Sequence, residues 1–114
     1  MELNEKLEQL TDDKESVIAR FGGNMSLLEK FLNKFAEDPT YTSLIQAVGA
    51  EDYSLIEMNA HTLKGVAANL GLDWLSSKAA AIVNAVRNDE KDKVDVLIPE
   101  LEAEYQRVIG ILKS

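Results

Sequence analysis

The side chains best suited to chemistry gather around His61, which is the only histidine of the chain. Lys64 follows it by three residues and Gly65 by four, so on an α-helix both would lie one turn from the imidazole on the same side. A free imidazole has a pKa of about 6.5, so its neutral nitrogen can act as a nucleophile near neutral pH. If that nitrogen accepted a phosphoryl group, the ammonium of Lys64 could offset the new negative charge.

Gly65 and Lys64 are both unusual in their setting. A glycine inside a helix costs about 0.5–1 kcal/mol relative to alanine, and its missing side chain would leave room for an in-line approach to phosphorus. Lys64 is the only basic residue between Lys34 and Lys78. However, single histidines are common on helix surfaces, and a glycine also permits close contact between helices. These residues alone therefore leave a purely structural role open.

The segment that carries His61 is predicted to be a helix over residues 52–70, with Asp52 as its N-cap and Gly71 at its C′ position. Successive residues advance about 100° around a helix. The positions opposite the imidazole then form an apolar core stripe: Ile56, Leu63, Val66, Ala67 and Leu70. The positions on its own side are expected to be exposed: Ser54, Glu57, Lys64, Gly65 and Ala68. His61 should therefore face solvent or a partner.

The rest of the chain has the same helical pattern, and we expect an all-α fold: an antiparallel four-helix bundle with additional short N-terminal helices. The four bundle helices are predicted over residues 24–37, 52–70, 73–88 and 90–112. A shorter helix over 39–50 is expected to lie aside, and the N-terminal segments are expected to pack across one end of the bundle.

Several residues mark the predicted helix ends. Asp12 with Glu15 is typical of a capping box, and Asn24 and Asp73 are further candidate N-caps. Pro39 suits a first helical position. Pro99 predicts either a kink or a late helix start, and we favour a kink because the apolar face continues in phase across it.

Length and composition exclude several function classes. The chain has 114 residues, a net charge of −8 and no cysteine. We expect a single domain over residues 1–114, without disulfides, thiol catalysis or a multi-histidine metal site. The acidic balance argues against nucleic-acid binding, and there is neither a secretory signal nor a long apolar run, so we expect a cytoplasmic location.

The segment from His61 to Gly71 resembles the signature of histidine-containing phosphotransfer (HPt) domains, H-x-[LI]-K-G-x-[AS]-x-x-[LIVM]-G. All of its defined positions match: His61, Leu63, Lys64, Gly65, Ala67, Leu70 and Gly71. The stretch from Gly23 to Phe35 and the last helix also resemble the family. The likeness extends over roughly residues 12–112.

The resemblance implies a relay role in two-component signalling. His61 would accept a phosphoryl group, on Nε2 in the family, from an aspartyl phosphate of a receiver domain and pass it to an aspartate of another receiver. Lys64 would lie beside the phosphoryl group, and Gly65 would give the receiver access. The partners implied are response-regulator receiver domains and a hybrid sensor histidine kinase.

By the same resemblance the domain is a monomeric phosphocarrier and not an enzyme. Its sequence contains neither of the glycine-rich nucleotide motifs, and the magnesium ion is expected on the partner receiver, so we expect no cofactor here. A docking surface around His61 is expected to include Met58, Ala68 and Tyr41. The alternatives are a helical module that binds receivers or a kinase without carrying phosphate, and a purely structural bundle in which Gly65 serves a helix contact.

Overall fold

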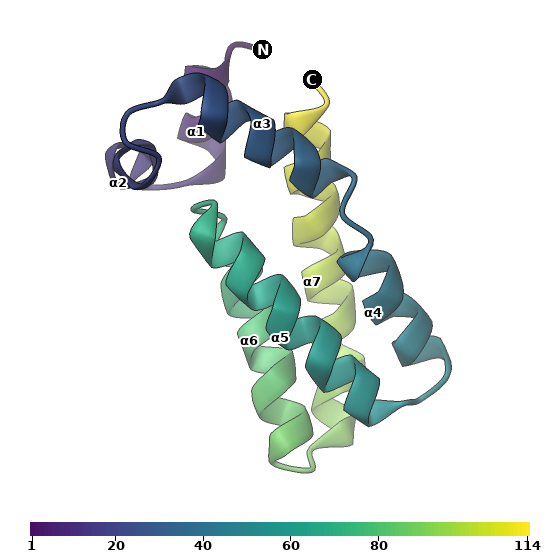
Figure 1. Cartoon of the computed structure of the whole chain (residues 1–114). Coiled ribbons are helices and arrows are strands. Elements are labelled where there is room, and N and C mark those ends of the chain that lie inside the picture. Colours follow the sequence, from purple (N-terminus) through teal and green to yellow (C-terminus); the bar gives the residue numbers. More distant parts are fainter.

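The computed structural model describes residues 1–114 as seven helices without a strand. The helices are α1 (Leu3–Leu10), α2 (Lys14–Arg20), α3 (Met25–Ala36), α4 (Thr40–Gly49), α5 (Tyr53–Asn69), α6 (Asp73–Arg87) and α7 (Lys91–Leu112). They form an elongated body of 41 × 22 × 18 Å, with both chain termini at one end and the α6–α7 turn at the other (Figure 1). The predicted all-α class is confirmed.

The four-helix bundle consists of α4, α5, α6 and α7, which run alternately in opposite directions (Figure 1). α5 packs against both α4 and α6, and α7 packs against α6. α7 also meets α4, where the rings of Tyr41 and Tyr105 stack with their centroids 3.7 Å apart. The prediction that residues 24–37 supply the fourth bundle helix is wrong, because α3 instead lies against the C-terminal part of α7.

The helix expected to lie aside takes the fourth position for a physical reason. Only three residues separate Gly49, which ends α4, from Tyr53, which begins α5. Such a short connection makes the two helices antiparallel neighbours. Leu44 and Ala47 of α4 are buried, so even this short helix contributes to the core.

The N-terminal helices pack at one end of the bundle, as predicted (Figure 1). Leu7 and Leu10 of α1 and Val17 of α2 are each 1% exposed and belong to the same core as the bundle residues. Gly71 explains how α2 can lie so close. Its φ of 76° is the left-handed conformation that glycine adopts easily, and a Cβ atom there would overlap the side chain of Val17.

Two predicted N-caps are confirmed. The Oδ1 atom of Asn24 accepts a hydrogen bond from the backbone N–H of Leu27 at 3.0 Å, and Oδ1 of Asp52 accepts one from Leu55 at 3.2 Å. These side chains satisfy N–H groups that would otherwise lack a partner at the first turns of α3 and α5.

Two other capping predictions are wrong. Asp13, and not Asp12, caps α2 by accepting from the backbone N–H of Ser16 at 3.2 Å, because α2 begins at Lys14. Asp73 is the first residue of α6 and Leu72 is its N-cap. Asp73 therefore acts through its charge in the first turn of the helix instead of through a capping hydrogen bond.

The two prolines differ in their outcome. Pro39 was predicted to be the first helical residue, but it is the N-cap of α4, which begins one position later at Thr40. Pro99 lies inside the continuous helix α7, so the alternative of a late helix start is wrong. Pro99 is exposed, which lets water reach the backbone carbonyl that the missing N–H leaves free.

Candidate functional site

The site is built on α5, which is 17 residues long and places His61 near its middle. Ile56, Ala60, Leu63 and Ala67 bury one side of the helix. His61 is exposed, as the helical spacing predicted, and its ring makes no hydrogen bond or ion pair within the chain. Both ring nitrogens are therefore open to a reacting group.

One turn toward the C-terminus, Lys64 presents a free cation. Its side chain is half-buried, not fully exposed as expected, and its ammonium has neither an ion pair nor a hydrogen bond. Its backbone carbonyl accepts a hydrogen bond from the Oγ atom of Ser76 on α6, at 2.9 Å. The backbone of α5 is thus held to α6 at this turn, while the ammonium of Lys64 remains available for an anion.

Gly65 lies in open space. A Cβ atom added to it would meet no heavy atom within 4 Å outside its own helical turn. No contact within the chain therefore requires glycine here, which removes the helix-contact explanation on which the purely structural alternative depended. The surface beside the imidazole is left unobstructed.

One turn toward the N-terminus, the negative charge of Glu57 is paired. Its Oε2 atom lies 3.1 Å from Nε of Arg87, near the end of α6. Two opposite charges thus lie one turn to either side of His61. The carboxylate of Glu57 is held in an ion pair, whereas the ammonium of Lys64 is free. Sequence spacing placed Glu57 on this side, but it contained no signal for its partner 30 residues later.

A second cation that the sequence analysis missed lies at the C-terminal end of α5. The Nη1 atom of Arg20, at the end of α2, donates to the carbonyl of Ala68 at 2.6 Å and lies 3.4 Å from the carbonyl of Asn69. Ala68 itself is half-buried. No sequence signal indicates that α2 comes this close, because its position depends on the tertiary packing of Val17 against Gly71.

The predicted docking residues have different outcomes. Met58, three residues before His61, is 56% exposed and lines a groove with Leu55 and Asn59 of α5 and with residues of α4. The lining residues from α4 and the turn after it are Ser43, Gln46, Ala47 and Ala50. A partly apolar groove thus lies beside His61 at Met58, and its use in docking stays a prediction.

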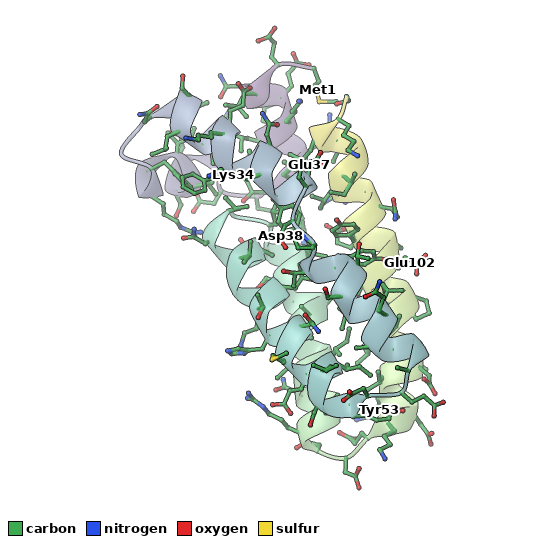
Figure 2. The ribbon with its side chains drawn as sticks, turned by 45° about the vertical axis from the view of Figure 1, so that its right-hand side comes forward. Met1, Lys34, Glu37, Asp38, Tyr53 and Glu102 are labelled. Carbon is green, nitrogen blue, oxygen red and sulfur yellow. The ribbon has the colours of Figure 1, made fainter.

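Tyr41, in contrast, is not the exposed residue that was expected. It is half-buried and stacks on Tyr105 at an interplanar angle of 7°, inside the α4–α7 contact. Burial, reinforced by the negative charge of Glu102, raises the pKa of Tyr41 to about 12. Figure 2 shows Glu102 on the side of α7 near α4. It also shows that Tyr53, the first residue of α5, and Met1 lie at opposite ends of the molecule.

Two further properties describe the whole chain. No group of three or more histidine, cysteine, aspartate or glutamate side chains is arranged to hold a metal ion. None of the seven helices combines the length and the apolar character needed to cross a membrane.

Comparison with known proteins identifies a family. Residues 26–110 match the Hpt domain family, so the match covers α3 to nearly the end of α7 and leaves α1 and α2 outside it. Neither the search of curated proteins nor that of solved structures found a match. Members of this family are helical phosphocarrier modules that work with receiver domains and kinases in two-component phosphorelays. The chain therefore belongs to the Hpt domain family and has a histidine phosphotransfer role in phosphorelays.

Proposed function

We propose that His61 accepts a phosphoryl group from an aspartyl phosphate of one receiver domain and transfers it to an aspartate of another. The observation that carries this proposal is the arrangement around an unbonded, exposed imidazole. A free ammonium lies one turn away, the nearest acid on the same side is ion-paired, and the space at Gly65 is open. These features favour a dianionic group on the ring and a large partner beside it.

The proposed step exchanges one bond to phosphorus for another. The lone pair of a neutral nitrogen of His61 attacks phosphorus, and the bond between phosphorus and the aspartate oxygen breaks. The carboxylate leaves with the electron pair, and the hydrogen on the other ring nitrogen stays in place. Transfer to the second receiver is the same step in reverse, with a different carboxylate as the nucleophile.

Lys64 and Gly65 have separate roles in this proposal. The ammonium of Lys64 stabilises charge on the transferred oxygens, a type of contribution that is large when the group is already positioned. Gly65 leaves room for in-line approach, on which phosphoryl transfer depends. Neither residue exchanges a proton with the reacting groups.

The partner receiver would supply the remaining chemistry, including its magnesium ion, so this chain would need no cofactor or nucleotide site of its own. We also propose that the chain acts as one monomeric domain over residues 1–114, in the cytoplasm, between a hybrid sensor histidine kinase and a response regulator. The presentation of a single reactive side chain on a rigid bundle supports a carrier role.

A phosphate-independent docking module is the second candidate, favoured by the exposed Met58 and its groove. Transfer assays separate the two. The protein is incubated with a radiolabelled, phosphorylated receiver, and acid-labile, alkali-stable label on the chain is measured together with receiver binding.

We expect label on the wild type and none on His61→Gln. Gln106→Asn is the matched control, because Gln106 is an exposed amide on α7, outside both α5 and the groove at Met58. Equal labelling of His61→Gln, or no label on the wild type with any receiver of the source organism, contradicts the proposal. Receiver binding that persists in both variants without any transfer supports the docking module.

A further inference from the structure

Arg20 contacts the helix that carries His61, although the proposed phosphoryl transfer assigns it no role. It is exposed at the end of α2, outside the residues that match the family, yet it reaches the helix that carries His61. The close packing of Val17, only 1% exposed, against Gly71 fixes where α2 ends. The position of the guanidinium is thus a property of the tertiary fold.

The helix geometry relates this cation to the site. Ala68, whose carbonyl holds Nη1 of Arg20, follows His61 by seven residues. Seven residues correspond to about two turns, so Ala68 lies within roughly 20° of the direction of His61 and about 10 Å further along the axis. Arg20 and Lys64 are therefore two cations associated with the His61 side of α5, in a chain of net charge −8.

The guanidinium keeps most of its binding capacity. Only Nη1 bonds within the chain, and neither Nε nor Nη2 has a partner. These two groups form the planar fork that binds carboxylates or phosphates through paired hydrogen bonds. At about 10 Å along the helix, the fork is too distant to bind a phosphoryl group on His61 itself. Its ligand must come from the surface of the molecule that docks there.

We propose that Arg20 binds an acidic side chain of the receiver domain at the edge of the interface and thereby sets the affinity and selectivity of docking. This inference rests on the proposed function, since it concerns the partner of the same site. Arg20 takes no part in the transfer step. The alternative is that Arg20 only caps the C-terminal carbonyls of α5.

The test separates docking from chemistry. The chain is first phosphorylated on His61 with phosphoramidate, a small donor that needs no interface. It is then mixed with increasing concentrations of a receiver domain to which the wild type transfers, and the half-saturating concentration and the maximal rate are measured. Arg20→Gln removes the charge, and Lys113→Gln is the control because it makes the same charge change at an exposed position near the C-terminus.

We expect Arg20→Gln to raise the half-saturating concentration about threefold to tenfold at low salt and to leave the maximal rate within about twofold. The difference should shrink as salt is raised, because exposed charges are screened. Lys113→Gln should match the wild type. Phosphoramidate labelling should be equal in all three proteins, so a failure of labelling would count against the proposed function and not against the role of Arg20.

An Arg20→Gln variant that folds and has the half-saturating concentration of Lys113→Gln overturns the inference, as does a loss confined to the maximal rate. If Arg20→Gln does not fold, the Arg20→Lys variant tests the inference in its place. It keeps the charge but lacks the fork, so we expect an increase of about twofold. An unchanged half-saturating concentration in that variant overturns the inference.

Discussion

Replacing Gly65 by glutamine should stabilise the protein and impair its function at the same time. An added Cβ at this position would meet no heavy atom within 4 Å outside its own helical turn, and the exposed position lets the rest of a glutamine side chain extend into solvent. Glycine is about 0.8–1 kcal/mol less favourable than alanine inside a helix, and glutamine is close to alanine. We therefore expect the free energy of unfolding to increase by about 0.5–1 kcal/mol, which corresponds to about 2–6 °C in Tm.

We expect the added side chain to impair transfer because it would obstruct the docking of the receiver domain. Interfaces pack as densely as protein interiors, and an extra side chain in a packed site typically costs about 1–3 kcal/mol. Transfer from a phosphorylated receiver should therefore slow by about 5- to 150-fold. Small phosphodonors need no docking, so phosphoramidate should still label His61 at nearly the wild-type rate.

Gly110 provides the matched control for this prediction. It also lies inside a helix, is exposed and would accept a Cβ without a contact within 4 Å. Gly110→Gln should raise stability by a similar or smaller amount and leave transfer unchanged. Thermal melts and transfer rates of the two variants are compared directly. A Gly65→Gln protein that is folded and transfers at the wild-type rate would refute the access argument.

Three other outcomes are expected. Lys64→Ala should slow transfer to His61 by about tenfold or more. The Tm should change little, because the ammonium of Lys64 makes no bond within the chain. Lys64→Arg should recover part of the transfer rate in the same assay. Arg87→Ala frees the charge of Glu57 one turn from the imidazole and should slow labelling about twofold at low salt, and adding Glu57→Gln should restore it. The pKa of Tyr41 is raised to about 12, so the unfolded chain loses the phenolic proton at a lower pH than the folded protein does, and the free energy of unfolding should fall as pH rises from about 10 to 12. Urea unfolding across that pH range should show a smaller fall in the free energy of unfolding for Tyr41→Phe than for the wild type. An equal fall in both proteins would contradict this prediction.

Much of the site could be predicted because it is local. The residues that matter for the proposed chemistry lie within one helix, and a spacing of about 100° per residue is enough to place His61 opposite Ile56 and Leu63. The cap at Asp52 and the terminator at Gly71 are equally local signals, and both were confirmed. The neighbouring Asp12 and Asp13 show the limit, since a shift of one residue in the helix start decides which of them caps.

The helical class, the buried stripe of α5 and the exposure of His61 are predictable from the amino-acid sequence, because they follow from propensity and periodicity within one segment. That α4 and not α3 completes the bundle follows from long-range packing, since an apolar stripe shows which face of a helix is buried but not which helix covers it. The same holds for the electrostatics of the site. Arg87 and Arg20 reach α5 from 30 and 48 residues away, through contacts that depend on how α2 and α6 pack and that leave no trace in local sequence spacing.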